Sequence, residues 1–326
     1  MSRDFTIDDP DLQHLLQRRQ DGIVSRDQLL QLGASANDIR RLLRRRDLVL
    51  RHPGVYSAHS GRLKRSELEW VAVLAAWPAA LAFESALPDH AGRAIQVAVA
   101  RGRRIQPPSG VVVTRMDDLR ERVDWQAAPP RLRLEHATLD TMERMLRSGD
   151  VAAAFATLSI VLHSRRTSVD ELDRVLRARA RFTGRAIATG LLEDARSGAC
   201  SVLERGYLHR VERAHGLPRG SRQSLSTSSG RATSQDVRYD EYGLVVELDG
   251  RAFHDSPHAR DADADRDLAE LAVRADATAR VTYGLVFRDG CRTAARIATI
   301  LMRRGWHGRP QRCAVCPRAM PSGVTW

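Results

Sequence analysis

The stretch Arg238–His254, RYDEYGLVVELDGRAFH, determines the fold predicted for the C-terminal part of the chain. Within it, large aliphatic residues alternate with Glu247 and Asp249, and a period of two places both acids on one face of a strand. Residues 233–239 have the pattern of a partner strand, and the turn-forming residues 240–243 join the two. The stretch therefore predicts a β-hairpin that ends in a cluster of carboxylates.

The register of this hairpin decides whether the acids meet. If Tyr239 pairs with Leu244, Asp236 lies directly opposite Glu247, with the two Cβ atoms about 5 Å apart. Like charges at that separation repel each other, whereas a cation between them would be chelated by the hard oxygen ligands that magnesium prefers. The sequence thus predicts a Mg²⁺ (or Mn²⁺) site at Asp236 and Glu247, which a slip of one residue would abolish.

An acid on one strand followed by an acidic motif on the next resembles the core of the PD-(D/E)xK nucleases. The chain is similar in particular to the Vsr-like (very-short-patch-repair-endonuclease-like) domain, in which the second strand has the sequence V-E-x-D-G and a histidine follows shortly. The resemblance covers about residues 201–305, and the following positions carry it: Glu204, Gly216–Pro218, Asp236, Glu247–Gly250, His254, Asp265–Asp267 and Arg280. It implies a restriction-endonuclease-like α/β domain on a mixed sheet over residues 197–309.

The resemblance also implies roles for single residues. Those expected to bind the metal are Asp236, Glu247 and the carbonyl of Leu248. Those expected to take part in catalysis are Glu204, Asp236, Glu247, Asp249 and His254, of which histidine suits general acid or base catalysis near neutral pH. Those expected to contact a phosphate are Arg266 and Arg280.

Three features leave alternatives open. Glu204 also stands three residues after Ser201, the spacing of a helix capping box, so it either caps the helix or faces the sheet. Arg280 is equally suited to an internal ion pair with Asp265. Asp249 occupies the position at which the PD-(D/E)xK pattern has its lysine, so the chain departs from the standard catalytic set there.

The charge of the chain indicates a polyanionic partner. The 326 residues carry a formal net charge of +12, with an isoelectric point near 10.7, so double-stranded DNA is the partner expected. The start of the chain lacks an apolar signal region, and no stretch reaches the roughly 18 apolar residues of a membrane span. We therefore expect a soluble, cytoplasmic protein with no membrane partner.

The first 60 residues predict a winged helix-turn-helix. Short helical patterns are followed by a small hairpin around Pro53-Gly54, and the segment 22–57 resembles the N-terminal domain of AbiEi-type antitoxins, including their G-V-Y wing. In such a fold the third helix enters the major groove. The residues expected to bind DNA are Arg40, Arg41, Arg44, Arg45, Arg46, Arg51 and Tyr56.

The remaining segments show no recognisable chemistry. Residues 61–196 predict a mostly helical middle domain with a β insertion, which we expect to be a scaffold or a partner surface. Residues 310–326 predict a disordered tail that contains Cys313 and Cys316. Zinc is not expected there, because a tetrahedral site needs further ligands and His307 offers one at best. Cys200 and Cys291 are interpreted as core residues.

The fold class predicted is therefore multi-domain α/β. The function predicted is that of a Mg²⁺-dependent DNA endonuclease that the winged helix directs to its target. The alternative is an AbiEi-like transcriptional regulator or antitoxin with an inactive nuclease-like domain, and a nuclease that processes RNA stays open as well. A homodimer, or a cognate toxin in the antitoxin case, is the protein partner expected.

Overall fold

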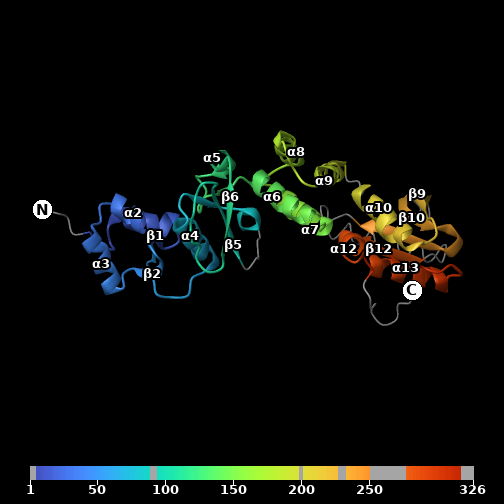
Figure 1. Ribbon diagram of the computed structural model, residues 1–326, viewed down its shortest axis with the longest axis horizontal. Helices are drawn as coiled ribbons and strands as arrows, with labels where there is room; N and C mark the ends of the chain where they lie inside the picture. The colour runs from blue at the N-terminus through green and yellow to red at the C-terminus, as the bar shows by residue number, and fades with distance from the viewer. Residues whose placement is uncertain (1–4, 89–93, 198–200, 227–232, 250–276, 317–326) are drawn as a thin grey trace. The chain divides into compact units, whose positions relative to one another are not determined.

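In the computed structural model, the described residues are 5–88, 94–197, 201–226, 233–249 and 277–316. The chain is mixed α/β (Figure 1). It divides into two compact units, residues 1–141 and 142–326. The three-part division at 60 and 196 stays a prediction. Among the helices that the structure describes, none is long and apolar enough to cross a membrane.

The first unit begins with short helices and a three-stranded sheet. In chain order these elements are α1 (Pro10–His14), the π-helix η1 (Leu15–Arg19), β1 (Ile23–Ser25), α2 (Arg26–Gln31), α3 (Ala36–Arg45), β2 (Val49–His52) and β3 (Val55–Ser57). The strands form an antiparallel sheet in the order β1-β3-β2. Ser25 with Gln28, and Ser35 with Asp38, form capping boxes that start α2 and α3.

A second sheet follows in the same unit. Its elements are α4 (Arg65–Ala75), β4 (Ala79–Leu81), the 3₁₀ helix η2 (Phe83–Ala86), β5 (Ile95–Ala100), β6 (Val111–Met116), α5 (Leu119–Arg122), β7 (Val123–Asp124) and β8 (Arg131–Leu132). The strand order is β6-β5-β4-β8-β7. β5 and β6 lie in the β insertion that the sequence predicts, and they pair parallel to each other. β7 and β8 have two residues each, too few for a period-two pattern to reveal them.

The second unit combines helices with a four-stranded sheet. The helices before the sheet are α6 (Leu134–Arg147), which begins in the first unit, then α7 (Val151–His163), α8 (Val169–Ala178), α9 (Arg185–Ser197), α10 (Ser201–Tyr207), the π-helix η3 (Leu208–Glu212) and the 3₁₀ helix η4 (Arg213–His215). The later elements are β9 (Ser221–Ser226), β10 (Thr233–Tyr239), the 3₁₀ helix η5 (Asp240–Tyr242), β11 (Leu244–Asp249), β12 (Ala277–Thr282), α12 (Tyr283–Phe287) and α13 (Gly290–Arg303).

The sheet of this unit has the order β12-β11-β10-β9. β10 is antiparallel to both β9 and β11, whereas β12 runs parallel to β11. The helix α7 packs on the C-terminal elements, because Phe155 stacks on Tyr283 with ring centroids 3.8 Å apart and an interplanar angle of 11°. The helices from residue 142 onward therefore share one compact unit with this sheet.

Candidate functional site

The β10–β11 hairpin has the register that the sequence predicts. Tyr239 pairs with Leu244, and Val237 pairs with Val246. Continued by one residue, this antiparallel ladder brings Asp236 opposite Glu247. The side chain of Asp236 lies outside the described residues, so the approach of the two carboxylates stays a prediction.

The acids of β11 alternate with its buried aliphatic residues. Leu248 is buried, whereas Glu247 and Asp249 on either side of it are half-buried. Side chains alternate between the two faces of a strand, so Glu247 and Asp249 share one face, as the sequence predicts. This face carries carboxylate oxygens, the donor type that Mg²⁺ accepts.

Arg280 lies beside Glu247. The parallel pairing of β11 with β12 brings the two residues into register, and Arg280 Nε lies 3.5 Å from Glu247 Oε2. Both side chains are partly exposed, at 38% and 25%. The Arg280 guanidinium, which the sequence predicts to contact a phosphate, therefore neutralises part of the charge of Glu247, the candidate metal ligand.

Glu204 lies half-buried in α10, and the start of that helix is capped by another acid. The buried carboxylate of Asp194 accepts hydrogen bonds from the Ser201 N–H at 3.1 Å, from the Ser201 hydroxyl and from the Val202 N–H at 3.0 Å. The Ser201 N–H, which a capping box would direct to the Glu204 side chain, thus bonds to Asp194. Three expected residues, His254, Asp265 and Arg266, lie outside the described residues.

The helix α3 presents a basic face to solvent. Ile39 and Leu42 are buried in the core of the first unit, and the positions on the opposite face at a spacing of three to four residues are Asn37, Arg40, Arg41 and Arg44. Arg40, Arg44, Arg45 and Arg46 are exposed. Arg41 is partly covered, since it pairs with Asp38 at 2.7 Å and donates to the Phe5 carbonyl at 2.8 Å.

Tyr56, which the sequence places in the DNA interface, is a core residue. It is 5% exposed and packs with the apolar side chains of the first three-stranded sheet and its helices. Burial raises the pKa of its hydroxyl above the ordinary value for tyrosine. β3 is the central strand of its sheet and has α4 packed against it, so little of the Tyr56 side chain faces solvent, and its role in DNA binding stays a prediction.

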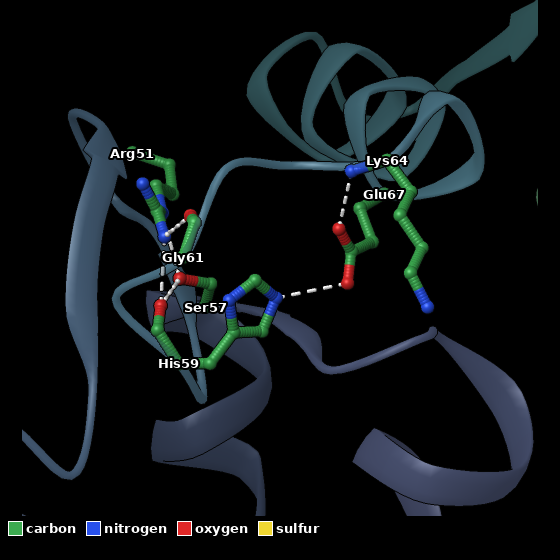
Figure 2. Close-up of polar contacts among 6 residues, drawn as sticks. All are labelled: Arg51, Ser57, His59, Gly61, Lys64 and Glu67. Carbon is green, nitrogen blue, oxygen red and sulfur yellow. Dashed lines mark hydrogen bonds and ion pairs between the residues drawn. The ribbon is translucent and has the colours of Figure 1, made fainter.

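Arg51, expected to bind DNA as well, has its guanidinium turned toward Ser57, His59 and Gly61 in the segment around the end of β3 (Figure 2). Its Nε donates to the Ser57 hydroxyl at 2.7 Å, and one Nη donates to the carbonyls of His59 and Gly61 at 2.7 and 2.8 Å. These bonds fix the segment that leaves β3. Arg51 is therefore a structural residue of the hairpin.

The same segment is held from the other side by Glu67 (Figure 2). The Glu67 carboxylate accepts from the Lys64 N–H at 2.6 Å and lies 2.9 Å from His59 Nε2. Burial opposes the charge of Glu67, but the hydrogen bonds from Lys64 and His59 outweigh it and hold the pKa of Glu67 below its ordinary value.

The cysteine-rich segment near the C-terminus is placed against the second unit as far as Cys316. Its Cys313 and Cys316 lie beside His215 and Cys291, and these four residues could hold a metal ion. The sequence offers His307 as a possible further ligand, whereas the neighbours in the fold are His215 and Cys291. His215 and Cys291 are 76 residues apart in the sequence, so no local spacing could have identified them.

Comparison with known proteins adds little to this description. No family model matches the chain, and no curated protein matches it. Among solved structures, the chain is similar to the RV2827C protein from Mycobacterium tuberculosis, with a TM-score of 0.35 and 22% identity over 55% of this chain and 73% of that chain. A similarity of this size leaves the function to be argued from the chain's own residues.

Proposed function

We propose that the protein is a DNA-binding protein whose C-terminal part is a Mg²⁺-dependent DNA endonuclease. The observation that carries this proposal is the register of β10 and β11, with Tyr239 opposite Leu244. If this register continues by one residue, Asp236 lies opposite Glu247, as expected for a nuclease metal site. The sheet order β12-β11-β10-β9 with one parallel pair at β11–β12 supports a PD-(D/E)xK-like core.

Asp236, Glu247 and the carbonyl of Leu248 would hold the metal. A bound Mg²⁺ would polarise the scissile phosphate and lower the pKa of an attacking water molecule. Asp249, on the same face as Glu247, would orient that water molecule, and Glu204 and His254 would assist proton transfer. Arg280 would exchange its bond to Glu247 for a phosphate oxygen of the substrate.

DNA binding is proposed for the first unit. The element order, in which the strands of the sheet β1-β3-β2 are interleaved with α2 and α3, supports a winged helix. In that fold α3 would enter the major groove. Its solvent face carries Arg40 and Arg44, which favours contact with phosphates and base edges.

A supercoiled-plasmid nicking assay tests the endonuclease. We expect the wild type to nick with Mg²⁺ or Mn²⁺, and Glu247→Gln and Asp236→Asn to lose nicking at unchanged DNA affinity. Glu241→Gln, in the turn between the same two strands, is the matched control that keeps activity. A wild type that binds DNA and never cuts with either metal would refute the enzyme.

The second candidate is a transcriptional regulator or antitoxin with an inactive nuclease-like domain. Two observations favour it: Asp249 stands where the nuclease pattern has lysine, and the Arg280 guanidinium lies against Glu247. This candidate predicts DNA binding without cleavage, and repression of a promoter that the first unit recognises.

A further inference from the structure

Four metal-binding side chains converge in the second unit. The Sγ atoms of Cys291 and Cys313 lie 3.6 Å apart, as do those of Cys313 and Cys316, and Cys316 Sγ lies 3.6 Å from His215 Nε2. All four donor atoms lie within 4.8 Å of one another. The edges of a tetrahedral zinc site, with Zn–S near 2.3 Å and Zn–N near 2.0 Å, measure about 3.5–3.8 Å.

The cluster joins three segments that are distant in sequence. His215 ends η4, Cys291 is the second residue of α13, and Cys313 and Cys316 come from the C-terminal segment. A backbone hydrogen bond fixes the C-terminal segment beside η4, since the Gln311 N–H donates to the His215 carbonyl at 2.8 Å. The donor atoms therefore meet because backbone contacts already align their segments.

The His215 ring is oriented as a metal ligand would be. It is fully buried, and its Nδ1 lies 3.0 Å from the Val211 carbonyl oxygen. A carbonyl accepts but cannot donate, so Nδ1 carries the proton and the lone pair of Nε2 faces the sulfurs. A backbone carbonyl that fixes the tautomer in this way is the common outer partner of a zinc-bound histidine.

The thiols are not paired in disulfides. The three described cysteines are free, and separations of 3.6 Å greatly exceed an S–S bond of about 2.05 Å. The Cys313-x-x-Cys316 turn is tight, because the Cys316 N–H donates to the Cys313 carbonyl at 3.2 Å. Both sulfurs consequently point to the same side, as a chelating pair requires.

We propose that His215, Cys291, Cys313 and Cys316 bind a structural Zn²⁺ ion. On binding, the three thiols release their protons to solvent and the thiolates and the His215 Nε2 lone pair donate to the metal, with no change of oxidation state. Protein ligands fill every tetrahedral position, which is the arrangement of a structural site and leaves no place for a reacting water. The ion crosslinks the C-terminal segment to α13 and η4, and this holds whether or not the proposed nuclease is active.

The site has a route to solvent. Cys291 and Cys313 line a cavity of about 1000 Å³, together with Arg210, Phe287 and Val315. Through this cavity zinc can enter and a chelator can reach the thiolates. We therefore expect a chelator to remove the ion completely, and reversibly under reducing conditions.

The test is metal analysis of the full chain, purified under reducing conditions without chelators. We expect about one zinc per chain, and after exchange with Co²⁺ the thiolate charge-transfer and tetrahedral ligand-field bands. Cys313→Ser and His215→Asn should lose the metal and these bands. His307→Asn is the matched control, a histidine of the same C-terminal segment outside the cluster, and it should keep both.

Absence of zinc from the wild type, or a Co²⁺ spectrum without thiolate bands, would overturn the proposal. Equal loss in His307→Asn would overturn the ligand assignment. Should the ligand variants fail to fold, the wild type decides: chelation should expose the segment after residue 305 to protease, and added Zn²⁺ should restore protection. Unchanged protection after zinc removal would refute the crosslinking role.

Discussion

The Tyr239 hydroxyl donates a hydrogen bond to Glu212 Oε2 at 3.2 Å inside the second unit. The Tyr207 hydroxyl lies 3.1 Å from that of Tyr239, and Arg222 Nη2 donates to the same Glu212 oxygen at 2.8 Å. Glu212, Tyr207 and Tyr239 are almost fully buried. Burial raises the pKa of both tyrosines, so they stay neutral donors around a charged Glu212–Arg222 pair that ties η3 to the sheet.

Within this network, removal of the Arg222 guanidinium should lower the free energy of unfolding more than removal of the Tyr239 hydroxyl. Arg222→Met leaves the buried Glu212 carboxylate without its cation, and we expect a loss of about 3–5 kcal/mol in the free energy of unfolding. Tyr239→Phe removes one hydrogen bond and should cost about 1 kcal/mol. Urea unfolding of the two variants measures the difference. Equal losses in the two variants would show that the Glu212–Arg222 ion pair contributes no more to stability than the Tyr239 hydrogen bond.

Arg51→Ala should destabilise the first unit without removing a DNA contact. The substitution deletes charged hydrogen bonds to Ser57, His59 and Gly61, which we expect to be worth about 1–3 kcal/mol together. Thermal unfolding measures this loss, and DNA affinity well below the transition should change little. Arg44→Ala is the charge-matched comparison: it should leave stability unchanged and weaken DNA binding. If Arg51→Ala instead weakened DNA binding and left stability unchanged, Arg51 would be a DNA contact.

Glu67→Gln should remove a pH-dependent part of the stability of the first unit. The folded-state pKa of Glu67 is below its unfolded value, so the charged carboxylate stabilises the fold above the unfolded pKa, near 4.5. This contribution is lost as the pH falls through the folded-state pKa. We expect wild type and variant to differ at neutral pH and to converge in acid. Thermal melts across that range give the comparison, and a difference that does not depend on pH would contradict the assignment.

The basic face of α3 should set the salt dependence of DNA binding. Each phosphate contact contributes about 0.9 to the slope of log affinity against log salt, so Arg40→Ala with Arg44→Ala should lower the slope by about two. Arg174→Ala with Arg177→Ala, two exposed arginines on α8, controls for net charge. Titrations at several salt concentrations measure the slope. Equal slopes for the double variant and the wild type would place the interface elsewhere.

Local features of the chain were predictable from the sequence because neighbouring residues decide them. The capping boxes at Ser25 and Ser35 depend on side chains three residues away. The register of Tyr239 with Leu244 follows from the short turn and the alternation of β11. The shared face of Glu247 and Asp249 follows from the geometry of a strand.

The tertiary structure decided which single polar side chains are exposed, which are hydrogen-bonded inside the protein and which are buried. The same local pattern that marks Arg40, Arg51 and Tyr56 as a basic, aromatic surface contains one exposed guanidinium, one that binds carbonyls and one ring in the core. Asp194 takes the helix cap at Ser201 because α9 packs beside α10, which no spacing near Ser201 reveals.

The sequence by itself determined the alternation of strands, the helix starts and the hairpin register, since each depends on backbone periodicity within a few residues. Only the tertiary structure decided which distant donors meet. His215 and Cys316 are 101 residues apart, and their contact at 3.6 Å exists because the folded sheet and helices bring the C-terminal segment back over η4. A zinc site requires several donors at one point in space, and spacing along the chain does not specify that point.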